Sequence, residues 1–92
     1  MKYSLIFTPE ADEDVKRIKK SGNKALFKKL NILLEEISEH PKTGTGKPEQ
    51  LKHYTEPTWS RRVSAEHRLV YEIQEEVITV LVLSAYGHYG DK

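Results

Sequence analysis

The chain has 92 residues, of which 37% are hydrophobic and 32% charged, and its formal net charge at pH 7 is +1. This composition is that of a globular protein, and the length fits one domain over residues 1–92. A nearly neutral charge excludes a protein that binds nucleic acid over its whole surface. The absence of cysteine excludes thiol catalysis, disulfides and thiolate metal sites.

Neither a membrane segment nor an export signal is predicted. No apolar run approaches the ~20 residues that span a bilayer, and the apolar run in MKYSLIF is too short for a signal peptide. We therefore expect a cytoplasmic protein with no membrane partner. The charge is unevenly distributed, because residues 42–71 carry six Lys and Arg against three Asp and Glu, whereas residues 72–92 carry one against four. This pattern favours a localised anion site.

The first half of the chain predicts a strand followed by two helices. Residues 2–7 alternate between apolar and polar side chains, as a half-buried strand does. A helix is expected to begin next, because Thr8 can cap it and Pro9 fits its first position. The sequence SGN at 21–23 breaks this helix, and residues 24–39 carry a broad apolar face typical of a second one.

The second half predicts strands. The glycine-rich residues 42–48 form a connector, residues 50–54 a short strand, and residues 59–64 and 68–74 a hairpin. Residues 77–85 are so uniformly apolar that they predict a central strand buried on both faces. The expected fold class is α+β, with two N-terminal helices packed on a twisted, mainly antiparallel sheet.

Residues 46–73 differ from an ordinary core-forming stretch, because cations occupy several positions expected to point outward. We interpret this stretch as the working surface. Its notable side chains are a carboxylate, five cations, two histidines and the only tryptophan: Glu49, Lys47, Lys52, Arg61, Arg62, Arg68, His53, His67 and Trp59.

Three residues could combine into a catalytic set if the last strands form one antiparallel sheet: Glu49, Arg68 and His88. A carboxylate, a guanidinium and an imidazole supply a proton acceptor, a phosphate ligand and a proton donor. Metal-free cleavage of RNA requires these groups, since one takes the proton of the ribose 2′-OH and another protonates the leaving 5′-oxygen. The fixed cation stabilises the charge that develops on the phosphate.

The residue types alone leave a structural alternative open for each of the three. The glutamate could be a solvated loop charge, Arg68 could pair with Glu66 or Glu72 on the surface, and the histidine could be an exposed terminal residue. His53 and His67 are assigned no role. A zinc site is disfavoured because the histidine spacing matches no ligand pattern. The tryptophan is expected to anchor the core.

Four sequence strings carry a resemblance to a known family: GKPEQLKH, WSRRV, EHRLVY and GHY. In combination they resemble the YoeB/Txe branch of the RelE-type toxins, which are the endoribonuclease partners of toxin–antitoxin pairs. The resemblance covers essentially the whole chain. It implies a RelE-like microbial RNase fold with the order β-α-α-β-β-β.

The resemblance also implies roles for individual residues. Glu49 would be the general base, Arg68 the arginine that contacts the phosphate, and His88 the general acid, with Tyr89 as a further catalytic residue. The implied phosphate-binding cations are Lys52 and Arg62.

The implied activity is ribosome-dependent cleavage of mRNA that leaves a 2′,3′-cyclic phosphate and uses no metal or other cofactor. The implied partners are mRNA, the ribosome and a cognate antitoxin that wraps the toxin, and the choice between monomer and homodimer stays open. The chain differs from the family pattern in having Tyr86-Gly87 ahead of the histidine and three further residues, 90–92, after Tyr89. The role of this extension and the detailed role of Tyr89 therefore stay open.

Two other functions remain as alternatives. The first is a non-catalytic toxin that resembles the ParE-type inhibitors of DNA gyrase on the same fold. The second is a binding module whose basic patch only docks an acidic partner. Neither needs a base and an acid, so the joint presence of Glu49, Arg68 and His88 favours the nuclease.

Overall fold

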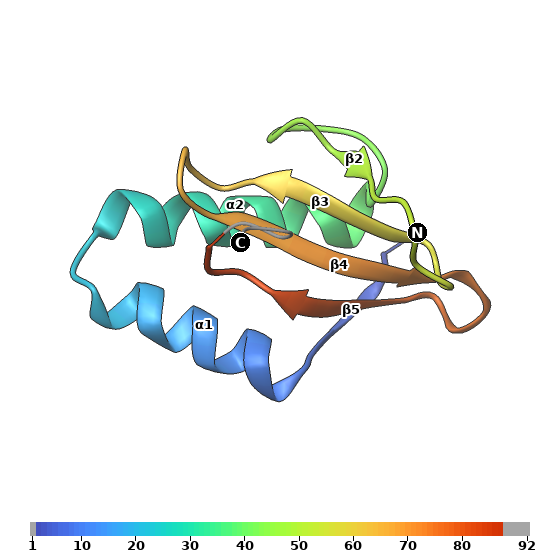
Figure 1. Ribbon diagram of the computed structural model, residues 1–92, viewed down its shortest axis with the longest axis horizontal. Coiled ribbons are helices and arrows are strands. Elements are labelled where there is room, and N and C mark those ends of the chain that lie inside the picture. The colour runs from blue at the N-terminus through green and yellow to red at the C-terminus, as the bar shows by residue number, and fades with distance from the viewer. Residues whose placement is uncertain (1, 88–92) are drawn as a thin grey trace.

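The computed structural model describes residues 2–87, so the predicted site residues His88 and Tyr89 lie outside the described residues. Two helices pack against one five-stranded sheet (Figure 1). The strand order is β1-β5-β4-β3-β2, in which β1 runs parallel to β5 and every other neighbouring pair is antiparallel. The elements are β1 (Ser4–Phe7), α1 (Pro9–Lys20), α2 (Lys24–Glu39), β2 (Glu49–Gln50), β3 (Thr58–Arg62), β4 (Arg68–Gln74), the 3₁₀ helix η1 (Glu75–Val77) and β5 (Thr79–Ser84).

Side-chain caps start both helices at the positions that the sequence predicts. The Thr8 hydroxyl accepts a hydrogen bond from the Ala11 amide at 3.1 Å, and the Asn23 side chain accepts one from the Leu26 amide at 3.0 Å. These bonds satisfy amide groups that have no partner within the helix. The predicted α+β class and the bounds of α2 are confirmed.

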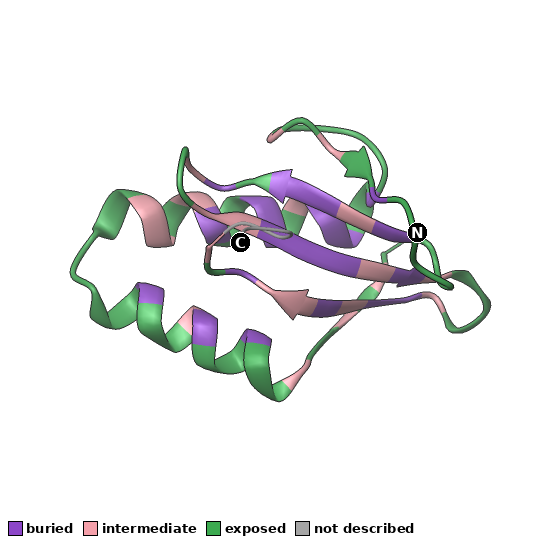
Figure 2. Cartoon of the chain, in the orientation of Figure 1, coloured by how far each residue is buried: buried purple, intermediate pink, exposed green. Residues whose placement is uncertain are grey.

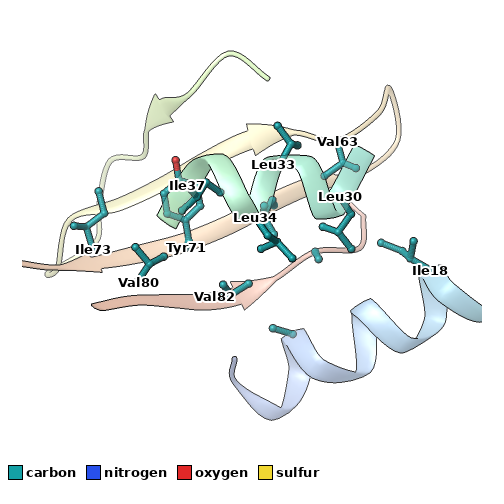
Figure 3. Close-up of a cluster of buried hydrophobic side chains, with 13 residues drawn as sticks. Ile18, Leu30, Leu33, Leu34, Ile37, Val63, Tyr71, Ile73, Val80 and Val82 are labelled. Carbon is teal, nitrogen blue, oxygen red and sulfur yellow. The ribbon is translucent and has the colours of Figure 1, made fainter. Parts of the chain in front are cut away.

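The helices cover one face of the sheet, and the core lies between them (Figures 2 and 3). Leu30, Leu33 and Ile37 of α2 are fully buried there. They belong to the same cluster as Tyr71 of β4 and Val80 of β5. We call the opposite side of the sheet the open face. None of the helices within residues 2–87 is long and apolar enough to cross a membrane.

The strand predicted over residues 77–85 lies in the interior of the sheet as expected, but its predicted extent and its burial on both faces are wrong. Val77 is 64% exposed in η1, and Ile78 has a left-handed backbone with φ of 48°, so the strand begins only at Thr79. β5 is an interior strand between β1 and β4, whereas β4 is the middle of the sheet. Leu81 and Leu83 are only half-buried because they follow the strand alternation onto the side away from the core.

The predicted strand over residues 50–54 is much shorter in the structure. Only Glu49 and Gln50 pair with β3, and the Leu51 amide adds one hydrogen bond to the Thr58 carbonyl at 2.8 Å. His53 then adopts a φ of 69°, which an extended strand cannot accommodate. This two-residue strand precedes the predicted hairpin of β3 and β4, which is confirmed with slightly different bounds.

Candidate active site

The strand register places Glu49, Arg62 and Arg68 on the open face. Alternate residues of a strand point to opposite faces, and Trp59 of β3 packs against the core, so Arg62, three residues on, points away from it. Arg62 lies opposite Arg68 of β4. Glu49 lies opposite Ser60, which is two residues from Arg62 on the same face. Three predicted site residues therefore share one surface.

The strand order limits how far apart these residues lie. Glu49 and Arg68 belong to strands that are separated only by β3, so their backbones lie roughly 10–12 Å apart by ordinary strand spacing. The side chains of Glu49 and Arg68 are long, so their charged groups can lie closer together than their backbones. Glu49 and Arg62 are exposed and Arg68 is half-buried, so both cations and the carboxylate can meet a ligand on this face.

Lys52 lies outside the sheet, beyond Glu49 on the side away from Arg62 and Arg68, because β2 runs antiparallel to β3 toward Thr58. It is exposed in the loop that follows β2 and precedes β3. The chain before His88 approaches the site, because the Arg68 amide donates a hydrogen bond to the Gly87 carbonyl at 2.8 Å. The last described residue therefore lies beside one of the predicted catalytic residues.

Arg61 does not belong to the working surface, which corrects the sequence interpretation. It is fully buried, and its Nε donates to the Tyr71 hydroxyl at 3.1 Å. Its Nη1 bonds the Glu36 carboxylate at 2.8 Å and the Thr45 carbonyl at 3.3 Å. Its Nη2 donates to two more carbonyl oxygens, those of His40 and Thr43. Alternation along WSRR could have revealed this, since Arg61 shares a side with Trp59.

This buried arginine holds the connector that leads to Glu49. The Tyr71 hydroxyl donates to the Pro41 carbonyl at 2.7 Å, and burial raises the pKa of Tyr71, which keeps that donor protonated. At the other end of the connector, the Arg62 amide donates to the Gly46 carbonyl at 2.7 Å. The backbone is thus fixed three residues before Glu49.

Glu36 completes this attachment. Its carboxylate accepts hydrogen bonds from the Thr45 amide at 2.6 Å and the Thr45 hydroxyl at 3.1 Å. The hydrogen bond from the Thr45 amide makes the largest contribution to lowering the pKa of Glu36 below its ordinary value. The hydroxyl bond and the Arg61 guanidinium lower it further. The carboxylate, which is partly exposed, therefore stays ionised opposite the buried guanidinium.

Comparison with known proteins shows which family the chain resembles. Residues 7–89 match the family described as the YoeB-like toxin of bacterial type II toxin–antitoxin systems. The Toxin YoeB of Synechocystis sp. is 43% identical over 68 residues, which are 74% of this chain and 77% of the relative.

Two solved structures from Staphylococcus aureus have the same fold. One is a YoeB dimer with 36% identity and a TM-score of 0.82, and the other is a YoeB–YefM complex with 37% identity and a TM-score of 0.79. Each alignment covers 97% of this chain and 100% of the other. On the strength of the family match and these relatives, this chain belongs to the YoeB-like toxins of bacterial type II toxin–antitoxin systems.

Proposed function

We propose that this toxin is an endoribonuclease that cleaves mRNA on the ribosome in the cytoplasm. The observation that carries the proposal is the shared open face, on which a carboxylate, Glu49, lies on the strand next to that of Arg62 and two strands from Arg68. A site that only docked a polyanion would gain nothing from a carboxylate among its cations, whereas proton transfer requires one.

The reaction follows from the roles of three groups. The Glu49 carboxylate takes the proton of a ribose 2′-OH, whose oxygen then forms a bond to the adjacent phosphorus. The bond from phosphorus to the 5′-oxygen breaks, and His88 donates a proton to that oxygen. The products are a 2′,3′-cyclic phosphate and a free 5′-OH, and the chemistry needs no metal or other cofactor.

The cations stabilise the charge that develops during this attack. Arg68 contacts the reacting phosphate, where a guanidinium can form two parallel hydrogen bonds to its oxygens. Lys52 and Arg62 bind neighbouring phosphates and fix the register of the message. Tyr89 completes the proposed catalytic set beside His88.

The proposed protein partner is a cognate antitoxin. The S. aureus YoeB occurs in a complex with YefM, and a second structure shows a YoeB dimer. By analogy, we propose that an antitoxin segment wraps this chain and neutralises it, and that the free toxin can pair with a second copy.

The proposal is tested by adding the purified toxin to translating ribosomes and mapping the ends of the cleaved mRNA. We expect cleavage at defined positions only when ribosomes are present, with 2′,3′-cyclic phosphate ends. Replacing the ribose at one cleavage position by 2′-deoxyribose should abolish cutting there and leave the other positions unchanged. Arg68→Ala and His88→Gln should each slow cleavage by ~10²-fold or more.

Two results would overturn the assignment. Unchanged cleavage and growth arrest by both variants would remove the proposed roles of Arg68 and His88. DNA damage on expression, with intact messages, would instead identify a gyrase-inhibiting toxin. The message incubated without ribosomes serves as the control for contaminating nuclease.

A further inference from the structure

The three residues that precede His88, which are Ala85, Tyr86 and Gly87, each contact a side chain from a distant part of the chain. The Ala85 amide donates to the buried carboxylate of Asp14 at 3.0 Å. The Tyr86 ring lies 4.2 Å from the His67 ring and 4.5 Å from the Arg17 guanidinium. The Gly87 amide donates to His67 Nδ1 at 2.9 Å. We call Asp14, Arg17 and His67 the C-terminal seat.

His67 is the member of the seat that contacts two consecutive residues of this segment. Its own backbone is well fixed, because its carbonyl accepts hydrogen bonds from the amides of Val63 and Ser64 at 3.0 and 3.2 Å. Its amide also donates to the Ser64 hydroxyl at 3.2 Å. A side chain on such an anchored turn can hold another segment in place.

The segment itself supplies little packing. Tyr86 is 41% exposed, and Gly87 has no side chain and adopts a left-handed φ of 82°. Only the Ala85 side chain is fully buried. The position of Gly87 therefore depends on hydrogen bonds to its amide and carbonyl, which come from His67 and from the Arg68 backbone.

We propose that His67 is a positioning residue for RNA cleavage, because it fixes the point from which the chain enters His88. The inference rests on the proposed function, since it takes His88 as the general acid. Misplacing a reacting group by about 1 Å can cost ~10²-fold in rate, so a hydrogen bond one residue before the acid has a large effect on turnover. The phosphate contacts of Lys52 and Arg62 do not depend on it.

The hydrogen bond also fixes the chemical form of the ring. A backbone amide can only donate, so Nδ1 must lack a proton, and the neutral imidazole must carry its proton on Nε2. This tautomer gives a distinct pattern of ¹⁵N chemical shifts. The pattern can be measured in the wild-type protein without any activity assay.

The experiment compares His67→Ala and His67→Asn in single-turnover cleavage on ribosomes. Asparagine places an acceptor oxygen close to the position of Nδ1, so it keeps the bond to Gly87, whereas alanine removes it. We expect alanine to lower the maximal single-turnover rate by ~10²-fold, with the half-saturating toxin concentration changed less than about threefold, and asparagine to restore most of the rate. His40→Ala removes an exposed histidine and is the matched control.

The outcomes separate this inference from the proposed function. If the wild type cleaves and His67→Ala cleaves equally fast, or if asparagine is as slow as alanine, the positioning role is wrong. If the wild type does not cleave, the proposed function fails. The nuclear magnetic resonance measurement then still decides whether His67 holds Gly87, because an Nδ1-protonated ring would contradict the bond.

Discussion

Arg61 and Arg62 are consecutive residues of β3 with opposite environments. The first is fully buried and bonds a carboxylate, a hydroxyl and three carbonyl oxygens, whereas the second is exposed on the open face. The family motif predicts that Arg62 binds a phosphate, and its exposure on the open face is compatible with that role. Arg61 was wrongly assigned to the working surface, because counting the charged residues does not show which of them point into the core. Alternate residues of a strand point to opposite faces.

Alanine substitutions at the two arginines should therefore affect different properties: protein stability for Arg61 and RNA binding for Arg62. Arg61→Ala should lower the free energy of unfolding by about 3–5 kcal/mol, because it leaves Glu36 and several carbonyl groups without their buried partner. Arg62→Ala should change stability by less than about 0.5 kcal/mol while weakening RNA binding. Urea denaturation and an RNA-binding assay measure both effects, and equal stabilities of the two variants would contradict the structure.

The Glu36 carboxylate should contribute stability that depends on pH. Its pKa in the folded state lies below the unfolded value of about 4.3, so the unfolded chain binds the proton more tightly. The contribution is complete above that pH and is lost as the pH falls through the folded-state pKa. Glu36→Gln should therefore destabilise the protein more at about pH 7 than at about pH 3. An equal loss at both pH values in denaturant titrations would argue against this pair.

At the scale of elements, β2, β3 and β4 bring the candidate site together. The hairpin and both helices were predictable, because caps, proline and apolar periodicity act over a few residues. The shortness of β2 was not, since the strand ends ahead of His53, whose left-handed backbone with a φ of 69° no local sequence signal predicts. The approach of the chain before His88 to Arg68 was expected only if the last strands formed one antiparallel sheet, and the hydrogen bond between Arg68 and Gly87 brings these two segments together.

The connector geometry should be sensitive at Gly46. This residue has a φ of 88°, and an added Cβ would lie 3.0 Å from the Arg62 carbonyl oxygen. Gly46→Ala should cost about 1–2 kcal/mol from its backbone conformation and should also slow cleavage by displacing Glu49.

Gly22→Ala is the matched control for this prediction. Gly22 has a similar φ of 82°, but a Cβ there meets nothing within 4 Å, and the residue lies between the two helices. Its alanine variant should lose similar stability and keep full activity. If both variants cleave at the wild-type rate, the connector does not control the position of Glu49.

At the scale of the whole molecule, the helices cover one face of the sheet (Figure 1), and the proposed chemistry uses side chains of the opposite face. The fold class was predictable from element order, but the sequence overestimated the burial of β5 because a uniformly apolar strand looks buried on both sides. The partners were predicted only from the family resemblance, and they stay a prediction for this chain. A chain of this size has a small reserve of stability, of order 5–15 kcal/mol.

Binding of the cognate antitoxin should therefore raise the melting temperature substantially. At a free antitoxin concentration of a hundred times Kd, linkage adds about 2.7 kcal/mol to the folded state. Each kcal/mol moves Tm by roughly 4–8 °C in a domain of this length, so a rise of about 10–20 °C is expected. A thermal scan against antitoxin concentration measures it, and an unchanged Tm for a demonstrated complex would contradict the prediction.

The central claim is that Glu49 acts as the general base on the open face. The most direct test is the single-turnover rate of mRNA cleavage on ribosomes by Glu49→Gln, with the affinity for the ribosome–mRNA complex measured in parallel. The proposed mechanism predicts a rate lower by ~10²–10⁴-fold and an affinity that is unchanged or slightly tighter, because glutamine keeps the shape but cannot take the proton. A rate within about twofold of the wild type would contradict it.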